Sequence, residues 1–239
     1  MIFLPGSDVK IKLWNYFGDL VKMVGEDHAK LLKGKAKGHD FTHTIMVAQY
    51  CLILSDDLKI GVLSWLAGLL HNTDRLFGYE VVSQKVDEYF RLIPEEINIE
   101  GSNIQISQSN LLVVKEAILN HSKLNDPSDG LITVILKDSD RLANAGSSLY
   151  PRGTQHCGNV LSYNPLYVDG FHPESTYSKA KSVLDNYRYC LEWEEMLRLP
   201  RAKEIGEKYF DALRHIIDGF KDQLEETGLY PYPFNVVDD

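Results

Sequence analysis

Hydrophobic residues recur at helical spacing along most of the chain, and no stretch alternates convincingly like a strand. The pattern predicts a first helix that is capped by Ser7 or Asp8 and runs to about residue 32. Further helices are expected over about 41–55, 59–71, 82–90, 107–121, 131–143, 175–197 and 201–227. The helix over 59–71 is apolar on nearly every side, so we expect it to be central in an all-α fold.

Three stretches depart from the helical pattern. The run KGKAKGHD separates the first two predicted helices, and the tail PYPFNVVDD should be extended or loose. Residues 144–174 carry several glycines and prolines, and a loop of that length in a compact domain is usually functional or disordered. One interpretation is that it covers a binding site, with Arg152 on a phosphate and Tyr150, Tyr163 or Tyr167 packed on a base, and the equal alternative is that these tyrosines are ordinary packing residues. No linker divides the sequence, which predicts one domain over 1–239.

Composition narrows the function classes. The net charge of −9 argues against non-specific nucleic-acid binding but leaves room for a small phosphorylated ligand in a local basic pocket. The three cysteines lack metal-type spacing, and an odd, scattered set suits a reducing compartment. The first residues do not follow the signal-peptide pattern, and the apolar stretch 60–70 is too short to span a bilayer. We therefore expect a cytoplasmic protein without membrane attachment, either a monomer or a homodimer.

Histidine and acidic side chains recur at helix positions that should face inward. His43 shares a face with Val47, Tyr50 and Leu54, and His71 ends the most apolar predicted helix. Asp140 follows Ile132 and Leu136 on one face, but periodicity favours the neighbouring Asp138 equally. A carboxylate buried beside imidazoles is costly unless a cation or hydrogen bonds compensate. The pattern makes a metal site plausible, although a single buried histidine is more often a hydrogen-bonded core residue.

Three ordered segments resemble the motifs of the HD-domain metal-dependent phosphohydrolases, and in particular the single-domain bacterial HD hydrolases. They are GHDFTHTIMVAQYCLIL, WLAGLLHNTDR and KDSDRLANAG, and the resemblance extends over about residues 36–225. It implies an all-α, single-domain HD-type helical bundle with one divalent ion, of which Mn, Fe, Co, Ni, Zn and Mg are all candidates. By position, it implies His43, His71 and Asp140 as ligands, because Asp140 precedes the expected Arg-Leu pair.

Asn72 departs from these motifs, because the family has aspartate after the second histidine. An amide oxygen can still bind a metal, but it brings no negative charge, so the affinity for a hard divalent cation should fall. Asp74 lies close enough in sequence to restore part of that charge. The sequence leaves open whether Asn72 is natural or introduced, and whether the site has full, altered or no activity.

The resemblance also suggests roles for residues around the metal. His39 and Asp40 are expected to support the ligand His43 without binding the metal themselves. Asp74 and His121 are candidates for proton transfer and charge stabilisation, and a helix-terminal surface histidine is an equal alternative for His121. Candidate phosphate contacts, each also readable as an ordinary surface cation, are Arg75, Lys123, Lys137, Arg141 and Arg152.

Two kinds of function agree with these residues. The first is hydrolysis of a nucleotide or small phosphate ester by a metal-activated water. The second is a catalytically silent HD fold that binds a nucleotide or another small phosphorylated ligand, which Asn72 favours. A helical interaction module without a small-molecule site ranks well behind both. An oxidative di-iron centre is disfavoured, because only His121 lies between Asn72 and Asp140 where further histidines would be needed.

Overall fold

The computed structural model describes residues 11–31, 40–147 and 149–234. Contacts divide the chain into two compact units, Met1–Ala143 and Asn144–Asp239. In chain order the elements begin with a short 3-10 turn at Leu13–Asn15, α1 (Gly18–Leu31), α2 (Phe41–Ile53), α3 (Leu58–Leu70), α4 (Thr73–Phe77) and α5 (Val82–Phe90). They continue with β1 (Glu96–Ile99), β2 (Ser102–Gln105), α6 (Gln108–Asn120), α7 (Leu131–Ala145), α8 (Leu149–Cys157), α9 (Val183–Met196) and α10 (Pro200–Glu226).

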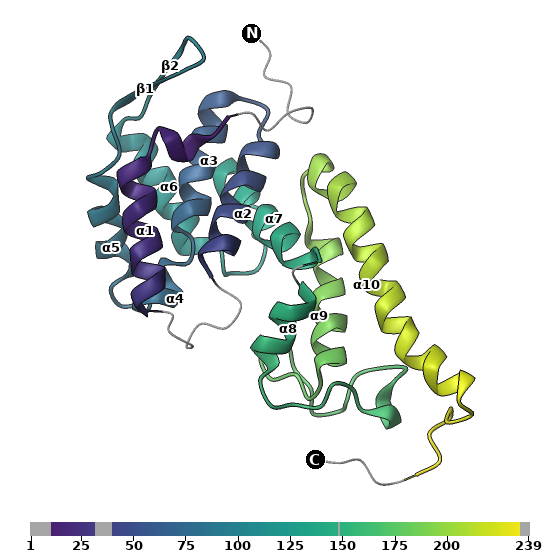
Figure 1. Cartoon of the computed structure of the whole chain (residues 1–239). Helices are drawn as coiled ribbons and strands as arrows, with labels where there is room; N and C mark the ends of the chain where they lie inside the picture. Colours follow the sequence, from purple (N-terminus) through teal and green to yellow (C-terminus); the bar gives the residue numbers. More distant parts are fainter. Residues whose placement is uncertain (1–10, 32–39, 148, 235–239) are drawn as a thin grey trace. The chain divides into compact units, whose positions relative to one another are not determined.

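Helix α3 is the centre of the first unit, as its apolar sequence predicts. All of its residues from 61 to 70 are buried, and it packs against α2 on one side and α6 on another (Figure 1). Asp57 caps its first turn by accepting a hydrogen bond from the backbone N–H of Ile60 at 2.9 Å. The end of α3 therefore lies inside the unit, next to the start of α2.

The packing of α2 on α3 depends on Gly68. A Cβ atom at this position would lie 2.7 Å from the Cα of Ala48 and 2.9 Å from its backbone nitrogen. Only glycine lets the two backbones come this close without displacement. Trp65, one turn earlier, donates its indole N–H to Gln49 at 2.9 Å, which ties the same two helices together. The approach brings His43 and His71 to the same end of the pair.

A small antiparallel hairpin was not expected from the sequence. Strands β1 and β2 pair from Glu96 with Gln105 to Ile99 with Ser102, and Gly101 forms the turn at φ +85°. Ile97, Ile99 and Ile104 are buried while their neighbours are exposed. This alternation is the ordinary strand signal, but each strand has only four residues, too few for a convincing period.

The second unit has its own core, built by α8, α9, α10 and the segment between α8 and α9. Its buried apolar residues include Leu149, Val168, Leu184, Tyr187, Cys190, Leu213, Ile217 and Leu224. Arg188 of α9 donates to the backbone carbonyls of Tyr167, Val168 and Gly170. These bonds hold the preceding loop against α9, so this loop is packed rather than loose.

The expectation that 144–174 forms one long loop is therefore wrong. That stretch contains α8 and a 3-10 turn at Pro165–Tyr167. The helix expected from about 175 begins only at Val183, because Ser182 caps it by accepting from the backbone N–H of Asp185 at 3.0 Å. The prediction of a single domain stays a prediction beside the two compact units. Ser7 and Asp8 lie outside the described residues.

Within the residues that the structure describes, no helix combines the length and the hydrophobicity needed to cross a membrane. The first predicted helix is too long at its start, because a 3-10 turn at Leu13–Asn15 precedes α1 and α1 begins only at Gly18. The remaining predicted helices agree with α2, α3, α5, α6, α7 and α10 to within two residues at each end.

We predict that Gly68→Ala lowers the free energy of unfolding by about 1–3 kcal/mol, because the new methyl group meets the backbone of Ala48. Gly219→Ala is the matched control, since nothing lies within 4 Å of a Cβ at that helical position. The control should stabilise the protein by about 0.5–1 kcal/mol. Urea unfolding measures both, and equal effects of the two changes would refute the close helix approach.

Candidate metal centre

His43 enters the site from the first turn of α2. Asp40 caps this helix, and its Oδ1 accepts a hydrogen bond from the backbone N–H of His43 at 2.8 Å. The cap holds the backbone of His43 at the helix start while its side chain points inward, where the residue is 2% exposed. Asp40 thus fixes the backbone that carries His43. His39, its predicted companion, lies outside the described residues.

His71 directly follows α3 and is oriented by that helix. Its Nδ1 lies 2.7 Å from the carbonyl oxygen of Gly68. Because a carbonyl can only accept, Nδ1 carries the proton, and Nε2 of the neutral ring presents its lone pair. This Nε2 is buried and has no hydrogen-bond partner among the described residues. Burial lowers the pKa of His71 well below its usual value, although Asp140 acts in the opposite direction.

Asp140 of α7 completes a group of three. Its Oδ1 lies 3.1 Å from Nε2 of His43 and 3.8 Å from Nε2 of His71. Burial by itself would raise the pKa of Asp140, but the contact with His43 and the proximity of His71 outweigh it and lower that pKa well below its usual range. The carboxylate is therefore charged at neutral pH.

The structure separates Asp140 from Asp138, which periodicity alone does not. The side chain of Asp138 is fully buried and lies 3.4 Å from Nη1 of Arg141. Arg141 also donates from Nη2 to Asn125 at 2.9 Å. Asp138 and Arg141 thus join α7 to the preceding loop, whereas Asp140 alone of the two carboxylates lies beside the histidines.

His121 lies against the histidine pair. It follows α6, and its ring centroid is 5.4 Å from that of His71, nearly perpendicular to it. Its Nδ1 donates to the carbonyl oxygen of Ile118 at 2.7 Å, the same arrangement that His71 makes with Gly68. The ring is only partly buried. Nε2 is therefore the atom of His121 that can meet a ligand.

Asn72 is held by a chain of buried polar groups that the sequence reading missed. Its Nδ2 lies 3.0 Å from Oγ1 of Thr44, and the same oxygen lies 3.0 Å from Nε2 of His28. Nδ1 of His28 lies 2.8 Å from the carbonyl oxygen of Val24. A signal for His28 is present in the sequence, since it follows Leu20 and Val24 on one helix face, as His43 precedes Val47.

Asp74 is not among the three residues whose ligand atoms converge. Its Oδ1 accepts from the backbone N–H of Arg75 at 2.8 Å, and its Oδ2 lies 3.9 Å from Nε of Arg75. The carboxylate is almost fully buried, and Oδ2 has no hydrogen-bond partner among the described residues. Its predicted role in proton transfer stays a prediction.

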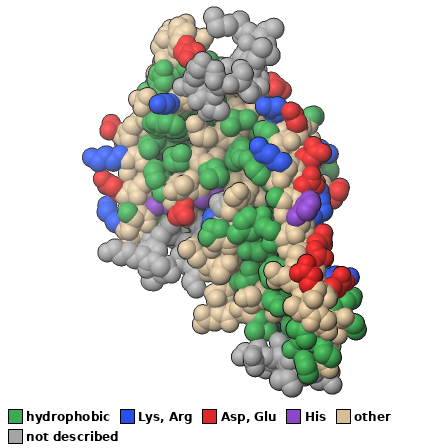
Figure 2. Space-filling model, turned by 45° about the vertical axis from the view of Figure 1, so that its right-hand side comes forward, with side chains coloured by type: hydrophobic (Ala, Val, Ile, Leu, Met, Phe, Trp, Pro, Cys, Tyr) green, Lys and Arg blue, Asp and Glu red, His purple; other side chains and the backbone are tan. Residues whose placement is uncertain are grey.

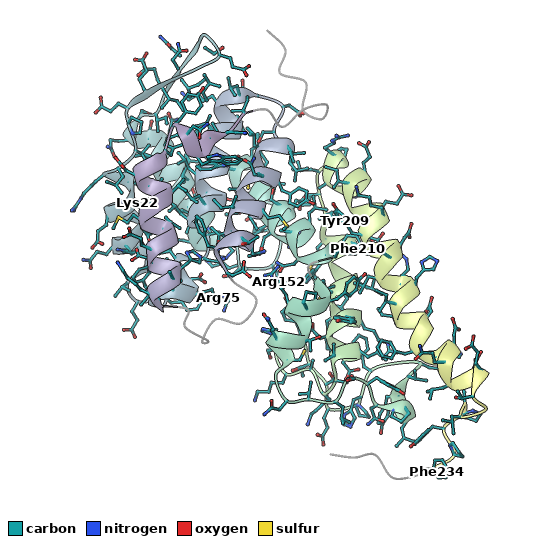
Figure 3. All side chains as sticks on the ribbon, in the orientation of Figure 1. Lys22, Arg75, Arg152, Tyr209, Phe210 and Phe234 are labelled. Atoms are coloured by element: carbon teal, nitrogen blue, oxygen red, sulfur yellow. The ribbon has the colours of Figure 1, made fainter. Side chains whose placement is uncertain are left out.

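The predicted phosphate contacts differ in their surroundings. Arg75 extends from α4 at the lower end of the first unit in Figure 3. Lys123 is exposed and donates to Asn120 at 2.8 Å. Arg152 belongs to α8 in the second unit (Figure 3), and its predicted role stays a prediction. Lys137 is 2% exposed and donates to the carbonyl of Leu124 and to Asp129, so its ammonium group holds a loop.

A divalent ion fits the group formed by His43, His71 and Asp140. One ligand atom from each residue lies within 4.8 Å of the others. Nε2 of His71 is a buried lone pair that nothing in the described residues satisfies, and Asp140 supplies a negative charge. Two imidazole nitrogens and one carboxylate suit first-row transition metals better than magnesium or calcium. The described residues contain no other group of three such ligands.

The sequence has no match among the models of known protein families, and no curated protein is similar to it. Solved structures do match. One is an HD-superfamily hydrolase from Bacillus thuringiensis, with a TM-score of 0.61 at 18% identity over 88% of this chain and 97% of the other. Another, from Lactobacillus plantarum, has a TM-score of 0.59 at 12% identity over 89% of this chain and 98% of the other. The chain has the HD-type fold.

The expectation of an all-α HD-type fold is thereby confirmed. In this HD fold, α2, the end of α3 and α7 carry the three candidate ligands, which are the elements that the sequence motifs indicate. The likeness to solved structures is one of fold, and the chemistry has to be argued from the residues of this chain.

We predict that the metal-free protein loses stability as the pH falls from 7 to 5. Burial lowers the pKa of His28 in the folded protein, while the unfolded state keeps a value of about 6.5. Below about pH 6.5 the unfolded state binds a proton that the folded state does not, so stability present at pH 7 is lost. Urea midpoints should fall less steeply with pH in His28→Gln, and identical slopes would contradict this burial.

A second prediction concerns Lys137. Its side chain and that of Asp129 are 1% and 7% exposed, with Nζ 2.8 Å from Oδ2. Lys137→Met should lower the free energy of unfolding by about 3 kcal/mol, because it removes the cation that faces a buried carboxylate. Adding Asp129→Asn should recover part of that loss. A Lys137→Met protein as stable as the parent would show that this lysine is not structural.

Proposed function

We propose that the first unit is a metal-dependent phosphohydrolase centre acting on a nucleotide or another small phosphate ester. The observation that supports it is the convergence of His43, His71 and Asp140, with the lone pair of His71 fixed by its bond to Gly68. A divalent cation held there supplies Lewis acidity to a phosphoryl oxygen and lowers the pKa of water. Cytoplasmic location stays part of the proposal, as do a monomeric or dimeric state and independence from nucleic acids and membranes.

The residues of this chain have distinct tasks in the proposal. Asp140 supplies the negative charge that attracts the cation, and His43 and His71 supply imidazole nitrogens. His121 can exchange a proton with substrate only through Nε2, because Nδ1 is bonded to Ile118. Oδ1 of Asn72 is the atom of that amide which can act as a ligand, because Nδ2 donates to Thr44.

A small phosphorylated substrate agrees better with the charge distribution than a polyanion does. Among the described residues on the face of the first unit drawn in Figure 2, Lys and Arg side chains stand singly, with acidic ones among them, rather than as a patch. Binding of a nucleic acid backbone needs several cations in reach at once. A small phosphate ester needs only the cation at the centre and one or two basic side chains, for which Arg75 and Lys123 are the candidates.

A catalytically silent binder is the second candidate function, and Asn72 is the observation that favours it. With a single carboxylate, Asp140, among the candidate ligands, the group neutralises only half of a divalent charge. A site of this kind holds a divalent cation more weakly, so the ion that would activate water is bound for less of the time. Thermal stabilisation by nucleotides without turnover would favour this second function.

The direct test is metal binding. Isothermal titration should show one tight site for Zn, Co or Ni and much weaker binding of Mg, because two of the ligands are imidazoles. His71→Gln should weaken the transition-metal affinity by about 10–100-fold or more. His215→Gln is the matched control, because the exposed His215 makes the same Nδ1 bond to a carbonyl of its own helix at 2.7 Å, outside this group.

Turnover is tested with the metal-loaded protein on a panel of nucleoside mono- and triphosphates, cyclic nucleotides and sugar phosphates. Release of phosphate that is lost in Asp140→Asn supports hydrolysis. Metal binding without turnover of any ester supports the silent binder. Failure of every metal to bind, together with no turnover, in the parent and in Asn72→Asp would refute the hydrolase.

A further inference from the structure

The hydrogen bonds from Val24 to Asn72 have one direction. The carbonyl oxygen of Val24 accepts and cannot donate, so Nδ1 of His28, 2.8 Å away, carries the proton. His28 is 3% exposed, and its burial favours the neutral ring, whose Nε2 then accepts a hydrogen bond. This nitrogen lies 3.0 Å from Oγ1 of Thr44, so the hydroxyl of Thr44 donates to it.

The direction of the hydrogen bond from Thr44 to His28 determines which atom of Asn72 faces Thr44. A hydroxyl has a single proton, and His28 takes it, so Oγ1 can only accept from its other neighbours. The carbonyl oxygen of Asp40, 3.3 Å away, is the more distant claimant for that proton. The atom of Asn72 that lies 3.0 Å from Oγ1 therefore has to be the donor Nδ2. All the side chains in this chain of bonds are buried, so water does not replace a mismatched partner.

The reversed chain of bonds fails at its far end. If Asn72 turned its oxygen to Thr44, the hydroxyl would donate to it, and Nε2 of His28 would need a proton to reach Thr44. In the neutral ring, Nδ1 would then face the carbonyl of Val24 with a lone pair at 2.8 Å. Two acceptors at that distance repel each other, so the orientation of the amide follows from a backbone carbonyl two helices away.

We propose that His28 and Thr44 are positioning residues that orient the amide of Asn72, and that this buried pocket is matched to an amide rather than a carboxylate at position 72. His28, Thr44 and Asn72 form one relay from Val24 to the residue after His71. The relay turns Nδ2 toward Thr44 and leaves Oδ1 as the atom available to a metal or ligand. Only its consequence for metal affinity rests on the proposed function.

The relay explains why asparagine, rather than aspartate, occupies position 72. A carboxylate at position 72 has no N–H to donate, so Thr44 would have to donate to it. Nε2 of His28 would then lose the hydrogen bond that it accepts from Thr44, and Nδ1 already donates to Val24. Aspartate is thus mismatched with the neutral His28 of this chain, and Asn72→Asp alone is not a simple restoration of a charged ligand.

The first test reads the relay directly in the metal-free protein by nitrogen NMR. His28 should show a protonated Nδ1 and an unprotonated, hydrogen-bonded Nε2 at neutral pH. Thr44→Val should shift the Nε2 resonance and the side-chain NH2 resonances of Asn72, whereas Thr44→Ser, which keeps the hydroxyl, should leave them close to those of the parent. A proton on Nε2 of His28, or equal spectra for the serine and valine variants, would overturn the proposal.

The second test measures coupling between positions 28 and 72, which act on each other only through Thr44 in the proposed relay. Asn72→Asp should lower the urea midpoint of the parent. It should lower the midpoint less in a His28→Gln background, because a glutamine amide can present either its NH2 or its oxygen to Thr44. The same change in midpoint in both backgrounds would mean that there is no relay.

Metal titration separates this inference from the proposed function. If both hold, Thr44→Val weakens metal binding several-fold and Thr44→Ser stays within about twofold of the parent, because only the hydroxyl orients Asn72. A parent that binds no metal but shows the predicted His28 resonances and coupling refutes the function and keeps the relay. If the parent binds metal and the two Thr44 variants bind it with equal affinity, the relay has no effect on metal binding.

Discussion

Three histidines of the first unit share one constraint, a bond from Nδ1 to a carbonyl three or four residues earlier in the chain. His28 bonds to Val24, His71 to Gly68 and His121 to Ile118, all at 2.7–2.8 Å. Each bond fixes the tautomer and turns Nε2 away from its own helix. For His71 and His121 that nitrogen is left for the site, and for His28 it sets the direction of the relay to Asn72. The orientation of all three imidazole rings therefore depends on backbone carbonyl groups.

The same helices also explain why the site forms at all. Gly68 lets α3 approach the backbone of Ala48 in α2, and its carbonyl oxygen accepts the bond that orients His71. One glycine therefore sets both the distance between the two helices and the direction of a ligand. Asp140 then joins from α7, so residues far apart in sequence meet where the ends of α2 and α3 coincide.

Helix periodicity is sufficient to predict much of this fold, because few secondary structures other than a helix fit long amphipathic or fully apolar runs such as 59–71. It failed for short elements. The hairpin at 96–105 has too few residues for a clear period, and α8 lies in a stretch whose glycines and prolines suggest a loop. Arg188 orders that stretch through three backbone carbonyls, a long-range contact that no local pattern contains.

The candidate site, too, could be predicted from the sequence only in part. Spacing placed His43 and His71 on inward faces, but the choice between Asp138 and Asp140 needed the family resemblance, and the structure gives its physical reason in the pairing of Asp138 with Arg141. The sequence suggests Lys137 as a phosphate contact, because it does not show that the ammonium group is buried against Asp129. The relay through Thr44 could not be predicted, because it depends on the distances between three separate elements.

The central claim is that His43, His71 and Asp140 hold a transition metal through neutral Nε2 atoms and one carboxylate. X-ray absorption spectroscopy on the cobalt- or zinc-loaded protein tests it most directly. The account predicts two imidazole nitrogens and at least one carboxylate oxygen around the metal, with one imidazole lost in His71→Gln. A metal bound without imidazole, or with a shell that His71→Gln leaves unchanged, would contradict it.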